Sequence, residues 1–343
     1  MSSDQKEVLR KFNINNRRYI GGKSELLAEI FKAIPPKYLK GKFVDIFAGT
    51  GVVASEAAQY FNSVVVNDLL YSNLAIYEAF FGTSKFSKSK IIKFVNYANI
   101  EMKKDKTSNY FDKNFGGKFF SKTTARQIGF VRNLIDDNDF NLNRRERNIL
   151  LASLIYSADR IANTVGHYEA YRKKNEGFKE FSLGLIEPLD LTKSEIHRRD
   201  ANELVREIKA DVFYIDPPYN SRQYSRFYHV LETLTKWDNP ALYGVALKPL
   251  PENISEYCKV GAPEAFADLI ENINAKLIIV SYNNTYNSKS SSSKNKITLE
   301  QIEKVMRKKG STKIKKIEHK AFSAGNTDFD NHLEYLFITE VFK

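Results

Sequence analysis

Four consecutive residues, Asp216, Pro217, Pro218 and Tyr219, combine groups suited to chemistry on an exocyclic amine. Such an amine is a poor nucleophile, because its lone pair is delocalised into the ring. The Asp216 carboxylate and the Pro217 carbonyl can accept its two hydrogens, which favours a more tetrahedral nitrogen as a bond to a methyl group forms. Tyr219 supplies a ring that can stack on a base turned out of a duplex. A tight structural turn is the alternative explanation.

The flanking residues predict that this segment lies at the edge of a parallel sheet. Residues 211–215 form a short apolar run, typical of a buried strand, and the four residues follow its carboxyl end. Residues 43–47 form a second run, followed by a glycine-rich turn at 48–51, a helical stretch and a third run at 64–66. This order is the βαβ unit of an open α/β sheet, which places its site at the carboxyl ends of the strands.

The glycine-rich turn and its neighbours predict a nucleotide-like ligand. Gly49 and Gly51 allow close backbone approach, and the free N–H groups of the following helix favour an anion. Asp68 can accept both hydroxyls of a ribose, although a helix N-cap explains this residue equally well. Residues 18–24 (RYIGGKS) precede another helical pattern but lack the spacing of a phosphate-binding P-loop, so phosphate cleavage is not supported.

The middle of the chain has a different pattern. Residues 74–190 contain few strand-like runs and many basic residues, and 123–136 and 144–163 show helical spacing of apolar residues. We therefore expect a mostly helical domain at 74–190, inserted into a Rossmann-like α/β domain made of residues 1–73 and 191–343.

Two further features belong to the second half of the α/β domain. Residues 313–319 and 334–342 resemble an antiparallel pair that closes the sheet at one edge. Residues 283–296 are polar, Ser-rich and cationic, as expected for a loop.

Composition limits the class of protein. The formal net charge is +12, which attracts polyanions but is equally consistent with a basic surface that binds none. Cys258 is the single cysteine, so an intrachain disulfide framework and a cysteine-rich zinc site are excluded, and we expect no bound metal. The first residues are polar, and no apolar run is long enough to span a bilayer. We expect a cytoplasmic protein without a membrane segment.

Taken in order, these motifs resemble the Dam-like group of adenine-specific DNA methyltransferases with the α order of motifs. An Arg-Tyr-x-Gly-Gly-Lys segment comes first, then the glycine-rich loop, the acid at Asp68, a target-recognition insertion and Asp-Pro-Pro-Tyr. The resemblance implies a methyltransferase sheet, S-adenosylmethionine as methyl donor and catalysis by Asp216, Pro217, Pro218 and Tyr219. The expected cofactor-binding residues are Tyr19, Gly22, Lys23, Asp45, Phe47, Gly49, Gly51, Asp68, Asp200 and Asp216.

Two further segments, 220–233 and 163–168, resemble a subset of restriction-modification adenine methyltransferases. The resemblance implies transfer of a methyl group to the 6-amino group of adenine in double-stranded DNA, by base flipping. A restriction-modification role would add a separately encoded cognate endonuclease as a partner. The expected DNA-binding residues are Arg126, Arg132, His167, Arg222 and Tyr224.

Other activities remain as alternatives. Methylation of a cytosine ring carbon needs a cysteine after proline, whereas Cys258 follows Tyr257. Families that methylate the cytosine amine usually begin the four-residue motif with Ser, and many that act on RNA or protein glutamine begin it with Asn. An RNA adenine methyltransferase and a catalytically silent DNA-binding module therefore stay open.

Overall fold

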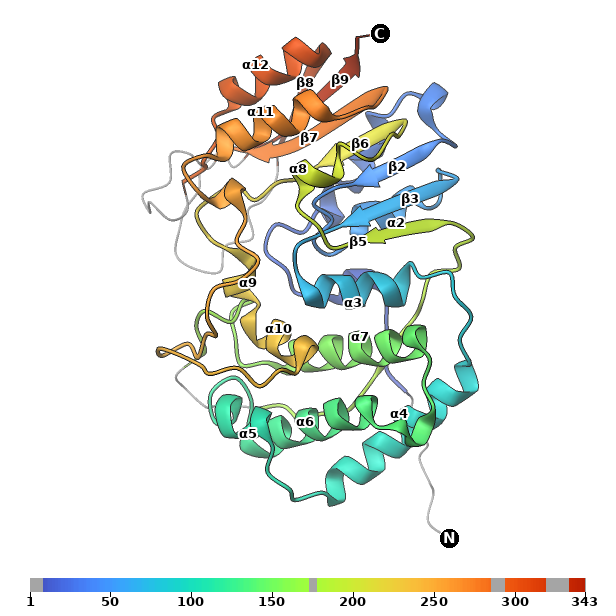
Figure 1. Ribbon diagram of the computed structural model, residues 1–343, viewed down its shortest axis with the longest axis vertical. Helices are drawn as coiled ribbons and strands as arrows, with labels where there is room; N and C mark the ends of the chain where they lie inside the picture. Colours follow the sequence, from blue (N-terminus) through green and yellow to red (C-terminus); the bar gives the residue numbers. More distant parts are fainter. Residues whose placement is uncertain (1–8, 173–177, 285–293, 319–332, 343) are drawn as a thin grey trace.

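The computed structural model describes residues 9–172, 178–284, 294–318 and 333–342. Most of the predicted Ser-rich loop therefore lies outside the described residues. The centre of the fold is a seven-stranded sheet with the order β5-β3-β2-β6-β7-β9-β8 (Figure 1). Its strands are β2 (Lys42–Asp45), β3 (Ser63–Asn67), β5 (Ser194–His197), β6 (Val212–Ile215), β7 (Leu277–Asn283), β8 (Gly310–Glu318) and β9 (Leu333–Val341).

The first five strands of that order run parallel, and β9 runs antiparallel to both β7 and β8. The register of β8 and β9 pairs Thr312 with Thr339. The α/β class with an antiparallel edge, predicted from the sequence, is therefore confirmed.

Both faces of the sheet are buried, because helices cover each one. Phe43 and Val64 belong to the hydrophobic cluster on one face, and their chain neighbours Val44 and Val65 belong to the cluster on the other. The first cluster includes α1 (Leu27–Lys32), α2 (Val52–Ala57) and α3 (Tyr71–Phe80), and the second includes α8 (Ala201–Leu204), α11 (Ala262–Asn272) and α12 (Leu299–Lys309).

A second layer of helices lies beyond α3 (Figure 1). Short polar caps start several of these helices; Asn143, for example, forms a reciprocal capping box with Glu146. The helices are α4 (Lys88–Lys104), α5 (Tyr110–Phe115), α6 (Lys122–Asp136), α7 (Arg144–Ile161), α9 (Tyr224–Phe227) and α10 (His229–Lys236).

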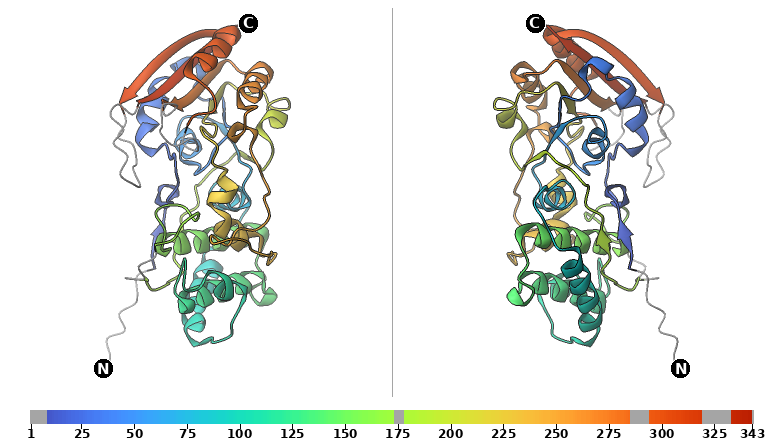
Figure 2. Two further views of the ribbon diagram at one scale, coloured as in Figure 1. Left: turned by 90° about the vertical axis from the view of Figure 1, so that its left-hand side faces the viewer. Right: turned by 90° about the vertical axis from the view of Figure 1, so that its right-hand side faces the viewer.

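The helical content predicted for residues 74–190 is present, but a separate inserted domain is not confirmed. The predicted boundary at 73/74 falls inside α3, and a single hydrophobic cluster joins α3, α7 and one face of the sheet. A two-stranded parallel pair, β1 (Lys11–Phe12) with β4 (Leu185–Ile186), also joins the N-terminal segment to the end of the helical region (Figure 2). The helical region therefore shares its core with the sheet.

Short 3-10 helices fill several connections, and they are Ile14–Asn16, Ser24–Leu26, Pro36–Tyr38, Asn138–Phe140 and η5 (Glu256–Cys258). Within the described ranges, no helix is both long and apolar enough to cross a membrane.

The sheet has a topological switch point between β2 and β6. From β2 the chain moves to β3 on one side, whereas β6 leads to β7 on the other. Asp45 at the end of β2 is in register with Tyr214 of β6. The glycine-rich turn after β2 and the four residues after β6 therefore emerge side by side, at the place where open α/β sheets bind ligands.

Candidate functional site

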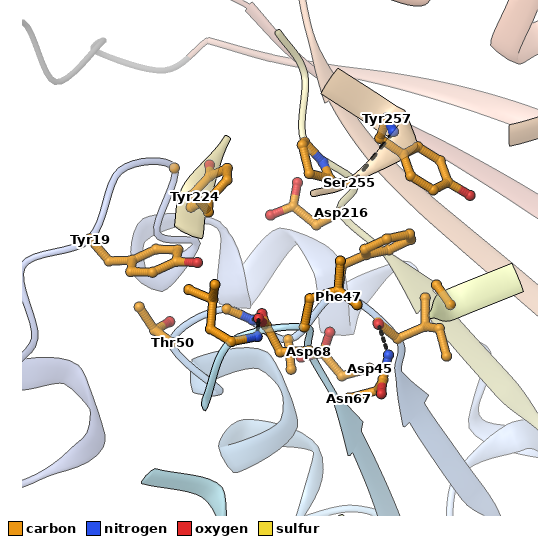
Figure 3. A pocket seen from close by; sticks show the side chains of 18 of the residues that line it. Tyr19, Asp45, Phe47, Thr50, Asn67, Asp68, Asp216, Tyr224, Ser255 and Tyr257 are labelled. Atoms are coloured by element: carbon orange, nitrogen blue, oxygen red, sulfur yellow. Dashed lines mark hydrogen bonds between the residues drawn. The ribbon is translucent and has the colours of Figure 1, made fainter. Parts of the chain in front are cut away.

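A pocket of about 890 Å³, including space open to solvent, lies at this switch point (Figure 3). Topological switch points of α/β sheets are among the places where small-molecule and cofactor sites occur. Figure 3 shows Tyr19 and Tyr224 on one side of Asp216, and Phe47 and Tyr257 on the other. The predicted cofactor-binding residues that line the pocket are Tyr19, Gly22, Lys23, Asp45, Phe47, Gly49, Asp68, Asp200 and Asp216.

Asp216 is held by three donors. Lys23 Nζ lies 2.9 Å from Oδ2, the Ser281 hydroxyl donates to Oδ1 at 3.0 Å, and the Tyr219 hydroxyl also donates to Oδ1. Ser281 in turn shares a 2.8 Å hydrogen bond with Tyr214. A carboxylate offers about four acceptor positions, so about one remains for a further donor.

Lys23 keeps its charge beside this carboxylate. Its side chain is only 5% exposed, and burial alone would lower the pKa of Lys23. Asp216 and Glu334 outweigh that effect, and the net pKa of Lys23 is raised above its ordinary value. Lys23 and Asp216 therefore form a buried ion pair at the edge of the pocket.

The other predicted catalytic residues take different positions. Pro218 lines the pocket and Pro217 is buried. The Tyr219 ring meets Tyr282 edge-on, with 4.6 Å between centroids, and Lys23 Nζ lies 5.0 Å from its centre. Tyr219 therefore lies next to Asp216, outside the set of residues that line the pocket.

Asp45 contrasts with Asp216. Its side chain is buried, and neither carboxylate oxygen makes a hydrogen bond of normal geometry within the described part of the chain. Burial, and then the charge of Asp216, raise the pKa of Asp45 well above its usual value, and the nearby Ala54 amide offsets only part of this. A buried acid without a partner is costly, so this carboxyl is suited to a donor supplied by a ligand.

Asp68 organises the glycine-rich turn. Its Oδ2 accepts from the Gly49 amide at 3.1 Å, and its Oδ1 accepts from the Leu70 amide at 2.9 Å. Gly49 and Gly51 have φ angles of 51° and 80°, where glycine avoids the steric cost of a side chain. Gly51 does not line the pocket; it precedes α2 as its N-cap. Asp68 thus supports the backbone and also lines the pocket.

Three tyrosines stack at one wall. The Tyr19 ring lies 4.8 Å from that of Tyr228 and 5.3 Å from that of Tyr224, in both cases nearly parallel. The Tyr228 hydroxyl accepts from the Ile20 amide at 2.9 Å. Arg17 lies over the Tyr19 ring and donates to Asn73 of α3. These contacts fix the segment before Gly21 against the helices that follow Asp216.

The opposite wall includes residues that the sequence analysis missed. Tyr257 meets Phe47 edge-on at 4.9 Å, and its hydroxyl donates to Asn202 at 2.8 Å. Gln223 and Ser255 exchange two hydrogen bonds through the Ser255 backbone, at 2.8 and 3.0 Å. Tyr257 and Ser255 come from a segment rich in proline and turn residues, which shows no periodic signal. The one sequence signal for this wall was an aromatic residue, Tyr257, within a polar stretch.

Asp200, predicted from the resemblance, lines the pocket and caps α8. It accepts hydrogen bonds from the amides of Asn202 at 2.8 Å and Glu203 at 3.2 Å. Asp200 therefore both caps α8 and lines the pocket.

A family model for D12 class N6 adenine-specific DNA methyltransferases matches residues 19–289. The chain belongs to this family. The match confirms the resemblance to adenine-specific DNA methyltransferases.

Several relatives carry the names of modification enzymes. Modification methylase StsI of Streptococcus sanguinis is 37% identical over 291 residues, 78% of this chain and 44% of that protein. Modification methylase LlaI of Lactococcus lactis subsp. lactis is 34% identical over 292 residues, 78% of this chain and 46% of that protein. Type II methyltransferase M.NlaIII of Neisseria lactamica is 27% identical over 341 residues, 94% of this chain and 98% of that protein. The chain thus spans less than half the length of the first two.

In this D12 family member, three of the residues predicted to bind DNA, His167, Arg222 and Tyr224, lie around the Phe227 ring of α9. Tyr224 lines the pocket, His167 stacks on Phe227 at 4.9 Å, and the Arg222 guanidinium lies 5.7 Å from the same ring. Arg126 is half-buried on α6. Arg126 is therefore the one of these four that lies apart from Phe227, and of the four only Tyr224 lines the pocket.

Arg132 requires a correction. Its guanidinium is buried, donates to the carbonyls of Leu234 at 2.8 Å and Thr235 at 3.2 Å, and pairs with Asp136 at 2.7 Å. A cation placed at the last carbonyls of α10 stabilises that helix end. Arg132 therefore joins α6 to α10 and is not available to a phosphate.

Proposed function

We propose that this chain transfers a methyl group from S-adenosylmethionine to the 6-amino group of adenine in duplex DNA. The observation that carries the proposal is the pocket itself: Asp216, the glycine-rich turn and Asp68 line one cavity at the switch point. A methyl donor and an amine acceptor can meet there within reach of a single carboxylate.

The residues present fit S-adenosylmethionine. Among the described residues, the buried Asp45 carboxyl has no hydrogen-bond partner of normal geometry, which suits the ammonium group of the methionine part, and Asp68 can accept the ribose hydroxyls. The aromatic wall of Phe47 and Tyr257 suits the adenine ring. When bound, the cofactor supplies an electrophilic methyl group on a sulfonium.

Asp216 carries the chemistry on the acceptor side. Lys23 and Ser281 hold its carboxylate in a fixed orientation, so its remaining acceptor position can take one hydrogen of the adenine amine. The Pro217 carbonyl takes the other hydrogen in this proposal. Both acceptors increase electron density on the nitrogen as it attacks, and no dedicated base is needed because the methylated ammonium product is strongly acidic. Preorganised acceptors of this kind supply most of the rate.

Tyr219 serves as the surface against which the extruded base packs. Its hydroxyl bond to Asp216 and its edge contact with Tyr282 hold the ring beside the acceptor. A base turned out of the stack needs such a ring to replace its lost neighbours.

The proposal also includes DNA binding and a role in a restriction-modification system. We assign phosphate and backbone contacts to Arg126, His167, Arg222 and Tyr224, and sequence recognition to the helical region 74–190. The names of the relatives favour a modification role. A separately encoded cognate restriction endonuclease is a further part of this proposal.

Transfer of labelled methyl groups tests the proposal. The protein is incubated with labelled S-adenosylmethionine and duplex DNA, RNA or protein, and digested DNA is analysed for N6-methyladenine. We expect label in duplex DNA alone, and none with the Asp216→Ala variant. Label confined to RNA would favour an RNA adenine methyltransferase. Cofactor binding without methyl transfer to DNA, RNA or protein would favour the catalytically silent DNA-binding module.

A further inference from the structure

A short hairpin at residues 243–248, between α10 and η5, exposes apolar side chains to solvent. The backbones of Tyr243 and Lys248 exchange two hydrogen bonds, at 2.8 and 3.0 Å. Tyr243 is 56% exposed, Val245 at the tip is 81% exposed, and Leu250 just beyond it is 70% exposed. Apolar surface left in water contributes nothing to folding, so packing within the chain does not explain this tip.

The hairpin is nevertheless firmly anchored. The buried His229 ring contacts the Ala246 carbonyl through Nε2 at 2.8 Å, and Arg226 donates to the Pro249 carbonyl at 2.5 Å. Lys248 forms a 2.5 Å ion pair with Glu169 from the loop after α7. Ordering an exposed loop costs conformational entropy. These anchors therefore present the tip in a defined position.

The hairpin is connected to the pocket on both sides along the chain. Its anchors Arg226 and His229 belong to α9 and α10, the helices that follow the Asp216 segment. After the hairpin, the chain returns to the pocket wall at Ser255 and Tyr257. In Figure 1 this segment projects toward the left, where the arrowheads of β2 and β3 point, and the left view of Figure 2 shows it on the face turned to the reader.

The charges around the hairpin suit a polyanion. The hairpin, α9 and the loop 164–171 form one surface, because Tyr168 donates its amide to the Phe227 carbonyl at 2.8 Å. Arg226 and Lys248 join these segments, Lys248 through the acid Glu169, and Arg222 lies over the Phe227 ring. Beside Tyr243 and Leu250, Lys236 pairs with the acids Asp238 and Glu252, so the four cations around the hairpin exceed the three acids by one. An apolar tip with cations beside it matches a duplex, whose bases are stacked inside and whose phosphates lie outside.

We propose that the tip of this hairpin, led by Val245, enters the base stack of duplex DNA beside the target adenine and fills the space that the adenine leaves. The inference rests on the proposed function and adds the element that extrudes the base. Unstacking a base costs a few kcal/mol, and an apolar side chain inserted into the gap offsets part of that cost.

The test compares two duplexes that contain the recognition sequence, which is first identified by mapping methylated adenines in DNA from cells that express the chain. The duplexes differ only in that one carries an abasic site opposite the target adenine, which makes extrusion easy. Single-turnover methylation is measured for the wild type, Val245→Ser and Val245→Leu. Val260→Ser, at another exposed valine (90%) outside the pocket and outside the helical region 74–190, is the matched control.

We expect Val245→Ser to methylate the paired duplex about tenfold more slowly than the wild type, yet the abasic duplex within about twofold. Val245→Leu and Val260→Ser should behave as the wild type on both. An equal loss on both duplexes would make Val245 an ordinary contact, and no loss on the paired duplex would overturn the proposal. Normal methylation with altered self-association would instead indicate a protein interface. A wild-type chain that methylates no DNA would overturn the proposed function first.

Discussion

Two aspartates end neighbouring strands of the same sheet, and their surroundings are opposite. Asp216 after β6 receives hydrogen bonds from Lys23, Ser281 and Tyr219. Asp45 at the end of β2 is buried with no such bond within the described residues. A carboxylate that accepts several hydrogen bonds, here called supported, has a fixed orientation. A buried carboxyl that accepts none, here called unsupported, is costly until a ligand supplies a donor.

This difference separates two tasks within one pocket. The supported acid suits an acceptor that must be in place before the reaction, because preorganised dipoles need no rearrangement at the transition state. The unsupported acid suits cofactor binding, since its cost in the free protein is recovered when a donor arrives. Each of the following changes alters one member of this pair.

Replacement of Asp216 by Ala should have the largest effect. Loss of a preorganised group that acts on the transition state lowers kcat by about 100- to 1000-fold. Methyl transfer to duplex DNA is the measurement, and gel-shift affinity for the same DNA should change little. Asp211→Ala, at the other end of β6 and paired with Lys276 at 2.7 Å, is the control and should turn over normally. Near-normal turnover by Asp216→Ala would remove it as the acceptor.

Replacement of Asp45 by Asn should act on the cofactor. A hydrogen bond to a charged group contributes about 1.5–3 kcal/mol, so the affinity for S-adenosylmethionine should fall by roughly 10- to 150-fold. Isothermal titration calorimetry without DNA measures this directly. At saturating cofactor, kcat should stay within a few-fold of the wild-type value. An unchanged dissociation constant would show that Asp45 does not face the ligand.

Replacement of Ser281 by Ala should have a smaller effect on the supported acid. It removes one neutral donor from Asp216, worth about 1 kcal/mol, and kcat should fall about fivefold. The KM for S-adenosylmethionine should not change, because Ser281 contacts the acceptor side. A larger change in KM than in kcat would contradict the division of tasks.

The smallest effect should appear in the stability of the ligand-free protein. The pKa of Asp45 is raised by burial and by Asp216, so the folded state holds this proton to a higher pH than the unfolded chain does. The stability that this group contributes is therefore present below the ordinary carboxyl pKa of about 4 and is lost as the pH rises through the raised value.

Asp45→Asn cannot ionise, so its melting temperature relative to the wild type should rise between about pH 5 and about pH 8, by a few degrees. Differential scanning fluorimetry in matched buffers measures this difference. Addition of S-adenosylmethionine should reduce it, because the wild type then has a partner for Asp45. A difference independent of pH would mean that Asp45 stays protonated, or finds a partner, in the free protein.

The sequence by itself determined the positions of the main motifs. Asp216 follows an apolar run and Gly49 follows another, and such runs form parallel strands whose carboxyl ends meet at one edge of a sheet. The helices of the middle region were also predictable, because their apolar spacing and polar caps are local. Apolar spacing and helix caps depend only on residues that are close together in the chain, so they can be read from the sequence of a single protein.

The tertiary structure alone decided which side chains support or face the ligand. Ser281 lies in an apolar strand, and only the pairing of β7 beside β6 brings its hydroxyl to Asp216. Arg132 looked like one of many surface cations, until the packing of α6 against α10 buried its guanidinium. Whether Asp45 has a partner depends in the same way on groups far away in the chain. A polar side chain acquires its role from contacts across elements, and those contacts exist only after the hydrophobic faces have packed.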